Sequence, residues 1–267
     1  AYEISLGLVG SEMCIRDSYT KEVSAKKRGH TREVYFLRQL GQTDLAQLKL
    51  DHIQSHHIAK LRDSRLEKNK PDTVLRELTI INHMFNVCIK DWSYPITNPV
   101  KQIYKPKNSS SRKRRLTLYE YYFLLRNNTI NPKLKNIIAL AIETGMRRGE
   151  ILQIHPRNIK DRILVLPITK NGSSRQIPLT KKAIQILNDS KLPFETTPNA
   201  LRLAWSRLKK KGSINNLHFH DLRHEAISRF FEKGLSIPEV ALISGHRDYK
   251  MLFRYTHLKA EDILRKL

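Results

Sequence analysis

The sequence predicts a mainly α-helical protein with one small antiparallel β-sheet, an α+β fold divided into two domains. Apolar residues recur at helical spacings of three or four over most of the chain. Only residues 163–168 and 175–179 have strand character, and the turn-forming residues 169–174 join them as a hairpin. A length of 267 residues is large for a single core, which favours two domains.

Residues 22–104 predict a small helical domain. One apolar pattern ends at Gly41, as is typical of a helix C-terminus. Another follows Pro71, a residue suited to a first helical turn, and its apolar positions step by four, three, four and three residues: Val74, Leu78, Ile81, Phe85 and Cys88.

Residues 1–21 do not match this pattern. Residues 1–18 carry three acids against a single Arg in an otherwise strongly basic chain. We therefore expect this segment to be a disordered or artefactual leader that is unrelated to the rest of the protein.

Residues 105–115 predict a basic linker between the domains. Residues 101–115 carry seven Lys or Arg and no acid, together with Pro106 and three consecutive serines. This composition is typical of an extended, solvated segment, and its charge suits a phosphate backbone. An ordinary linker, basic only because the whole chain is basic, is the alternative. The candidate DNA contacts are Lys105, Lys107, Arg112, Lys113, Arg114 and Arg115.

Residues 116–267 predict a second domain, mostly helical. The sequence TLYE at 117–120 is a capping box that opens a helix through Arg126. A second helix begins at Pro132 and ends at Gly145, and a short helix follows it. After the hairpin, helices are expected at 180–189, 198–211, 220–233 and 237–243, then around Tyr255 and at 259–267.

The charge of the chain indicates a polyanionic partner. The 49 Lys and Arg against 25 Asp and Glu give a formal charge of +24, for which nucleic acid is the default partner. A basic protein with no such partner remains the alternative.

Cys14 and Cys88 form neither a disulfide framework nor a CxxC pair, which fits a reducing cytoplasm. No apolar run approaches the roughly 20 residues that span a bilayer, so no membrane partner is expected.

Residues 220–255 carry the side chains suited to phosphate chemistry. His220 and Arg223 lie three residues apart at a predicted helix start, so both project near the positive end of that helix. His246 follows Gly245 at another helix end, and Tyr255 comes nine residues later. Arg grips phosphate by two oxygens, while His and Tyr move protons or attack phosphorus.

The residues resemble, motif by motif, the tyrosine recombinases of the phage integrase family. That family is marked by a TGxRxxE box, a basic residue on a β-hairpin, an HxxR box, a GH box and a following Tyr. The matching segments are ETGMRRGE at 143–150, TKNG at 169–172, HDLRH at 220–224, SGH at 244–246 and RYTH at 254–257. The likeness covers roughly residues 22–267 and implies a helical core-binding domain followed by a catalytic domain.

The resemblance implies a site-specific recombinase that cuts and rejoins DNA without metal, nucleotide or other cofactor. Tyr255 would attack the scissile phosphate to form a 3′-phosphotyrosine and release a 5′-hydroxyl. Arg147 and Arg223 would hold the non-bridging oxygens, where charge accumulates in the transition state. Arg148, about 100° further around a helix, is expected to point elsewhere.

The remaining roles implied by the resemblance concern proton transfer. His246 would donate to the same oxygens, and Lys170, near the hairpin tip, would protonate the departing 5′-oxygen. Arg175, Lys181 and Lys182 are nearby, and hairpin registers can slip, so they remain alternatives to Lys170. His220 would act either as general base for the tyrosine or as a donor to phosphate, and the sequence leaves both open. His224 is expected to be a packing or supporting residue.

The resemblance also implies an assembly on double-stranded DNA. The two domains would clamp the duplex, and four protomers would act on two DNA sites, held by a C-terminal tail that docks on a neighbouring protomer. An accessory DNA-bending protein is a further possible partner, and the protein would act at the cytoplasmic nucleoid. Two alternatives remain: a type IB topoisomerase-like enzyme that relaxes DNA, and an inactive DNA-binding remnant of a mobile element.

Overall fold

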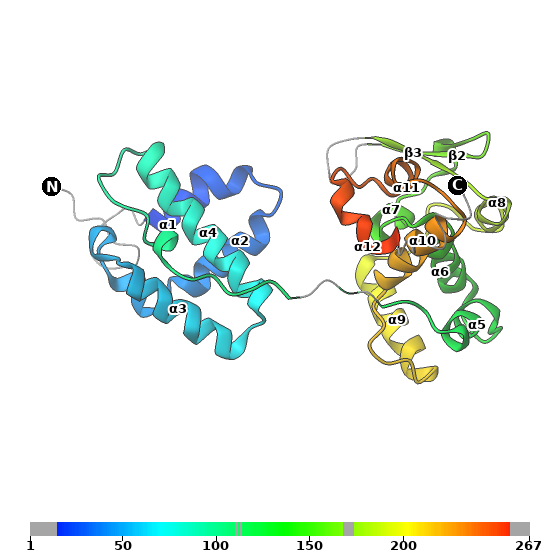
Figure 1. Ribbon diagram of the computed structural model, residues 1–267, viewed down its shortest axis with the longest axis horizontal. Coiled ribbons are helices and arrows are strands. Elements are labelled where there is room, and N and C mark those ends of the chain that lie inside the picture. Colours follow the sequence, from blue (N-terminus) through cyan, green and yellow to red (C-terminus); the bar gives the residue numbers. More distant parts are fainter. Residues whose placement is uncertain (1–14, 110–111, 113, 168–173, 257–267) are drawn as a thin grey trace, which may run out of the picture. The chain divides into compact units, whose positions relative to one another are not determined.

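The computed structural model describes residues 15–109, 112, 114–167 and 174–256 (Figure 1). The chain divides into two compact units, Ala1–Ser111 and Arg112–Leu267, which are treated separately below. The described residues are mostly helical, with one three-stranded antiparallel sheet. This confirms the predicted fold class. No helix in the described part of the chain has both the length and the apolar character needed to cross a membrane.

In the part of the first unit that the structure describes, four α-helices are joined by short turns. Its helices are α1 (Ile15–Ser18), α2 (His30–Leu40), α3 (Ser55–Lys68) and α4 (Pro71–Lys90). Its π and 3-10 turns are η1 (Tyr19–Val23), η2 (Ser24–Lys26), η3 (Asp44–Gln47), η4 (Leu50–His52) and η5 (Pro99–Gln102). Pro71 occupies the first turn of α4, and the predicted apolar stripe of that helix is buried in the core of the unit.

The expected unrelated leader at residues 1–21 is wrong for the part that the structure describes. Ile15 is 2% exposed and Tyr19 is fully buried in the core of the first unit. The Tyr19 hydroxyl donates to Glu33 Oε1 at 2.8 Å, which satisfies a polar group that burial would otherwise penalise. The acidic composition of the segment did not predict this packing, which depends on one buried aromatic ring, that of Tyr19. Residues 1–14 lie outside the described residues.

The second unit holds eight α-helices among its described residues. These are α5 (Leu118–Arg126), α6 (Pro132–Thr144), α7 (Arg148–Leu152), α8 (Lys181–Asn188), α9 (Pro198–Lys211), α10 (Asp221–Glu232), α11 (Ile237–Ser244) and α12 (Phe253–Thr256), with 3-10 turns η6 (Pro156–Asn158) and η7 (Tyr249–Met251). The predicted capping box is confirmed, since Thr117 Oγ1 accepts from the Glu120 amide and Glu120 Oε2 accepts from the Thr117 amide, at 3.2 and 2.9 Å.

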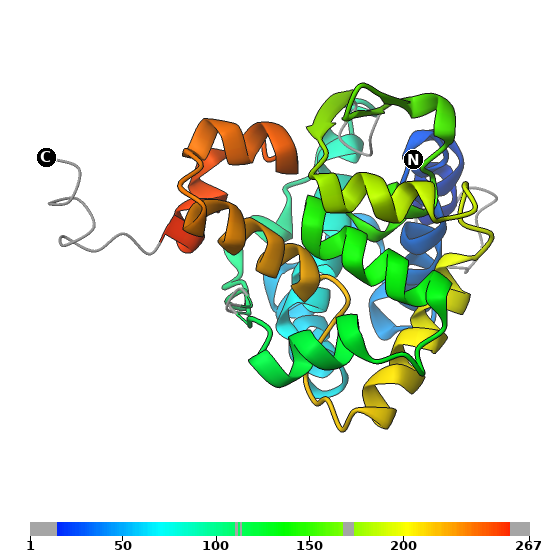
Figure 2. The same cartoon turned by 90° about the vertical axis from the view of Figure 1, so that its right-hand side faces the viewer.

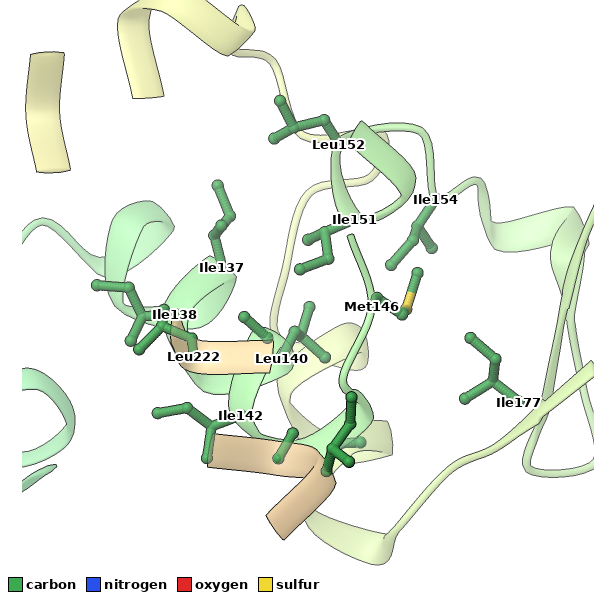
Figure 3. Close-up of a cluster of buried hydrophobic side chains, with 14 of the residues drawn as sticks. Ile137, Ile138, Leu140, Ile142, Met146, Ile151, Leu152, Ile154, Ile177 and Leu222 are labelled. Atoms are coloured by element: carbon green, nitrogen blue, oxygen red, sulfur yellow. The ribbon is translucent and has the colours of Figure 1, made fainter. Parts of the chain in front are cut away.

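Helix α6 lies at the centre of the second unit. It contacts α5, α7, α8, α9 and α10, and Figure 2 shows it among the green and yellow helices of this unit. Its buried face is part of the main hydrophobic core. Figure 3 shows Ile137, Leu140 and Ile142 of α6 beside Leu222 of α10 and Met146 of the following loop. The helix that carries the HxxR motif is therefore fixed against the helix that ends at the TGxRxxE motif.

The sheet consists of β1 (Ile159–Lys160), β2 (Ile163–Leu166) and β3 (Arg175–Pro178), in that order. The predicted hairpin is confirmed as β2 and β3, with Leu166 opposite Arg175, whereas β1 was not predicted. Strand β3 contacts α11, which brings the hairpin beside the helix that ends at the SGH motif. Lys170 and its neighbours, 168–173, lie outside the described residues.

Three arginines of the predicted linker are bound to carboxylates of the second unit. The pairs are Arg112 with Asp221, Arg114 with Glu120, and Arg115 with Glu225. All three carboxylate residues are buried, at 1%, 5% and 2% exposure. The predicted role of these arginines as DNA contacts therefore competes with an intramolecular role. Lys105 and Lys107 are exposed in the first unit, and Lys113 lies outside the described residues.

Candidate active site

Arg223 joins three of the sequence motifs. It lies in the first turn of α10 and is only 3% exposed. Its Nη1 donates to the carbonyl oxygen of Gly145 and its Nη2 to that of Ser244, each at 2.6 Å. These carbonyls lie at the C-terminal ends of α6 and α11, where helix carbonyls lack partners within the helix. A guanidinium is favoured there because it satisfies both acceptors and complements the negative ends of both helices.

Two glycines allow this convergence. Gly145 and Gly245 end α6 and α11 with φ of +62° and +70°, the left-handed conformation that glycine adopts without steric cost. A Cβ at Gly245 would also lie 2.5 Å from Arg175 Nη1. The glycine of the SGH motif is therefore required both by its backbone and by the arginine packed against it.

Glu150 bridges two further arginines. It binds Arg147 Nη1 at 2.9 Å and Arg175 Nη2 at 2.7 Å, and it also accepts a hydrogen bond from the Arg147 amide at 2.7 Å. Burial opposes ionisation of this carboxyl, but the charge of Arg175 and the hydrogen bonds from Arg147 hold the pKa of Glu150 below its usual range. Arg148 is exposed, as expected from its place around the helix.

The site carries excess positive charge. Burial, followed by the charges of Arg147 and Arg175, lowers the pKa of Arg223 to about 9. Arg223 stays protonated at neutral pH because this value is still well above 7. A cluster of fixed cations whose mutual repulsion is only partly offset by Glu150 is suited to an anion with more than one charged oxygen.

His246 lies at the edge of this cluster. Its Nδ1 is 2.7 Å from the hydroxyl oxygen of Ser244, the residue whose carbonyl binds Arg223. Burial, with the charges of Arg223 and Arg147, lowers the pKa of His246 to about 4. The ring is therefore neutral at pH 7, and a serine hydroxyl that donates to Nδ1 leaves the Nε2 proton available as a donor.

Tyr255 is buried, at 7% exposure, and its hydroxyl contacts His224 Nδ1 through a short hydrogen bond. The two rings are stacked, with centroids 5.7 Å apart and planes at 26°. The Arg254 guanidinium lies 5.5 Å from the centre of the Tyr255 ring. Burial raises the pKa of Tyr255, while the charges of Arg254 and Arg223 act in the opposite direction. The structure places His224, which was expected to be a packing or supporting residue, in direct contact with the phenol oxygen.

His220 is the N-cap residue of α10 and is exposed. Its ring meets that of His224 edge-on, at 5.1 Å between centroids and 86° between planes. Partial removal from water and the charges of Arg223 and Arg147 lower the pKa of His220. The next residue, Asp221, accepts from the His218 amide at 2.7 Å and pairs with Arg112, which fixes the start of the helix.

The structure thus brings together five of the six predicted catalytic residues: Arg147, His220, Arg223, His246 and Tyr255. The sixth, Lys170, lies outside the described residues. Sequence reasoning missed Arg175 as a member of the cluster and His224 as the partner of the tyrosine. No spacing rule points to Arg175, whereas His224 stands inside the HDLRH motif. Among the residues that the structure describes, no group of three or more His, Cys, Asp or Glu side chains could hold a metal ion.

Comparisons with known proteins identify the family to which the sequence is similar. The sequence model of the Phage integrase family matches residues 115–192 and 193–262. A shufflon-specific DNA recombinase of Escherichia coli is 41% identical over 268 residues, which span 94% of this chain and 70% of the relative.

Solved structures share the fold. A λ integrase fragment (residues 75–356 of that protein), solved as a dimer on a core-site DNA, matches 92% of this chain and 95% of its own, with a TM-score of 0.78 and 19% identity. A λ integrase tetramer on a Holliday junction matches 93% of this chain and 79% of its own, with a TM-score of 0.73 and 20% identity. With the family model and the Escherichia coli relative, these matches show that the chain belongs to the phage integrase family of tyrosine recombinases.

Proposed function

We propose that the protein cuts and rejoins DNA at specific sites through a covalent 3′-phosphotyrosine at Tyr255. The observation that carries this proposal is the convergence of three motifs on Arg223, which gathers a buried guanidinium, a neutral imidazole and a tyrosine around one positively charged space. This arrangement supports in-line attack on a phosphodiester, because the negative charge of the transition state meets donors that are already oriented.

In the proposed cleavage step, the Tyr255 oxygen bonds to phosphorus while the bond from phosphorus to the 5′-oxygen breaks. Arg147 and Arg223 bind the non-bridging oxygens, and His246 donates to one of them. Removal of a single preorganised donor of this kind costs about 3 to 4 kcal/mol, or on the order of 10² to 10³ in rate. The phosphotyrosine keeps the energy of the broken bond, so a 5′-hydroxyl from another strand can reverse the step and join it.

Proton balance requires an acid for the leaving group. Lys170 takes this role in the proposal, on the family resemblance of its TKNG segment and on its place in the loop between β2 and β3. The residue that follows this segment supports the assignment, because Arg175 of β3 is paired with Glu150, which also binds Arg147.

The partner in this proposal is double-stranded DNA. A formal charge of +24 supports it, and solved relatives of the same fold are DNA complexes, one a dimer and one a tetramer on a Holliday junction. By the same analogy, four protomers would act on two sites, with the C-terminal tail docking on a neighbour. The segment KAEDILRKL at 259–267, which is the proposed tail, lies outside the described residues.

The test is covalent capture on a nicked duplex. DNA flanking the gene supplies candidate sites, and a nick near the cleavage point lets the released fragment diffuse away, which traps the phosphotyrosine. Wild-type protein, without metal or nucleotide, should give a protein–DNA band that is absent with Tyr255→Phe. Joined products from two intact sites should follow with wild-type protein.

The alternatives give different results in the same assays. A topoisomerase-like enzyme would form the covalent band and relax a plasmid that lacks any paired site, but it would not join two sites. A DNA-binding remnant would shift the duplex and form no covalent band. Either result would overturn the proposed recombinase activity.

A further inference from the structure

We propose that His224 is the general base that takes the phenolic proton of Tyr255 during cleavage and returns it during joining. This assignment rests on the proposed function and deepens it, since the sequence motif alone leaves the identity of the base open. It makes His220, the first histidine of the HDLRH motif, a donor to the phosphate instead.

The geometry favours His224 over His220. Nδ1 of His224 is in hydrogen-bond contact with the Tyr255 hydroxyl, and the two rings stack at 26°. Helices α10 and α12 contact one another directly, so this pairing is set by helix packing and not by a loop. His220 instead meets the imidazole of His224 edge-on, one helical turn earlier.

The protonation states of His224 and Tyr255 are those that a general-base step requires. Burial, followed by the charges of His220, Arg254 and Arg223, lowers the pKa of His224 to about 4, although Asp221 acts against this shift. Burial raises the pKa of Tyr255. At pH 7 the phenol is therefore protonated and the imidazole is neutral. With the single imidazole proton on Nε2, Nδ1 accepts from the phenol, and this tautomer is the starting arrangement of the proposed general-base step.

A low pKa makes His224 a weak base without DNA, and we expect the bound substrate to raise that pKa. A phosphodiester between Arg147 and Arg223 adds negative charge close to the cations that disfavour the imidazolium. As the Tyr255 oxygen bonds to phosphorus, its proton passes to His224 Nδ1, while the leaving 5′-oxygen receives a proton from the general acid. In joining, the incoming 5′-hydroxyl gives its proton to the deprotonated form of that general acid as its oxygen bonds to phosphorus. The bond from phosphorus to the Tyr255 oxygen breaks, and the phenolate recovers its proton from the imidazolium.

The experiment compares His224→Asn and His224→Ala with wild-type protein. Asn is the matched variant because its side-chain oxygen falls near the position of Nδ1, so it can accept the phenolic hydrogen bond without taking the proton. His220→Asn serves as the control for loss of an imidazole on the same helix. The rate of covalent capture on the nicked duplex is measured between pH 6 and pH 9.

We expect wild-type protein to change by less than about threefold between pH 6 and 8, because its base is already deprotonated there. His224→Asn and His224→Ala should be slower at pH 7 by about 10² to 10⁴. Their rates should rise about tenfold per pH unit, because hydroxide must then remove the phenolic proton. His220→Asn should be slower without acquiring that slope. Unchanged DNA affinity and circular dichroism would show that the variants are folded.

Three results would overturn the assignment. A wild-type rate and a flat profile in His224→Asn would mean that His224 only orients the tyrosine. Faster capture in His224→Ala would mean that the hydrogen bond restrains the nucleophile. The steep slope in His220→Asn alone would make His220 the base. Absence of any wild-type band, by contrast, would count against the proposed function itself.

Discussion

Replacement of Arg115 by Ala should weaken the second unit through one buried carboxylate. Glu225 accepts from Arg115 Nε at 3.1 Å and Nη2 at 3.0 Å, from the Leu116 amide at 3.1 Å and from Arg229 Nε at 2.7 Å. The substitution removes the first two contacts and leaves the last two. It therefore tests whether the basic segment before α5 is a structural part of the unit.

The magnitude follows from what remains around Glu225. Loss of one partner from a fully buried ion pair costs about 3 to 5 kcal/mol. Arg115 itself is 37% exposed, and Arg229 still faces the carboxylate, so we expect a smaller loss of about 2 kcal/mol. For a domain of this size that corresponds to a fall in Tm of roughly 4 to 8 °C.

The pKa of Glu225 determines how the loss of stability in Arg115→Ala should vary with pH. Burial opposes ionisation, but the hydrogen bonds from Arg115 and Arg229 hold the pKa of Glu225 below its usual range in the folded protein. Its contribution to stability is therefore present above the unfolded-state pKa, near 4.3, and is lost as pH falls through the lower folded-state value. The difference between wild type and Arg115→Ala should accordingly shrink between pH 7 and the acidic range.

Urea denaturation at pH 7 and near pH 4 measures this difference in the free energy of unfolding. Arg202→Ala is a control that removes the same charge from an exposed helix and should change stability by less than about 0.5 kcal/mol. Glu225→Gln completes a double-mutant cycle. A loss no larger than that of the control, or a coupling energy near zero, would refute the reasoning. A reduced salt dependence of DNA binding would instead support the predicted phosphate contact.

Three further predictions concern the site. Gly245→Ala should abolish most covalent capture, because its Cβ would meet Arg175 Nη1 at 2.5 Å and its φ is +70°; circular dichroism should show a fold that is retained. Ser244→Ala removes the 2.7 Å contact with His246 Nδ1 and should slow capture by about 5- to 10-fold with little change in Tm, whereas an unchanged rate would show that the serine does not orient the imidazole. Lys170→Ala should be strongly impaired on ordinary DNA and restored on DNA with a sulfur in place of the bridging 5′-oxygen, since a thiolate leaves without an acid; no restoration would argue against Lys170 as the acid.

Local signals in the sequence were sufficient to predict most of the second unit. The capping box at Thr117, Pro132 at the start of α6 and Gly145 at its end all predicted helix boundaries that the structure has. Each of these signals acts through backbone groups within four residues, so it does not depend on the rest of the fold. The hairpin followed for the same reason, from its short turn segment.

Contacts between distant segments could not be predicted in this way. His224 was assigned to packing because its spacing shows which side of α10 it occupies but not that α12 lies there. Arg175 was missed because its partner Glu150 is 25 residues away in the chain. The ion pairs of the linker arginines could not be predicted from composition, which reports charge but not the buried carboxylates that bind it. Composition also predicted an unrelated leader at residues 1–21 and could not show that Tyr19 is buried, because its burial depends on contacts with α2 and α4.

The electrostatics of the site link substrate binding to chemistry. Burial, followed by the charges of Arg223, Arg147, Arg254 and Arg175, lowers the pKa of His246 to about 4. A bound phosphate adds negative charge to the same space, so it should raise the pKa of this imidazole and of Arg223. Titration of His246 by NMR in Tyr255→Phe protein, with and without duplex DNA, measures this directly. An upward shift would show that the phosphate supplies the missing charge balance, whereas an unchanged pKa would place the phosphate away from the cluster. The same charge effect applies to His224, the proposed base. Without the phosphodiester, the low pKa of His224 makes it a weak base, so Tyr255 would stay protonated and inactive in the absence of DNA.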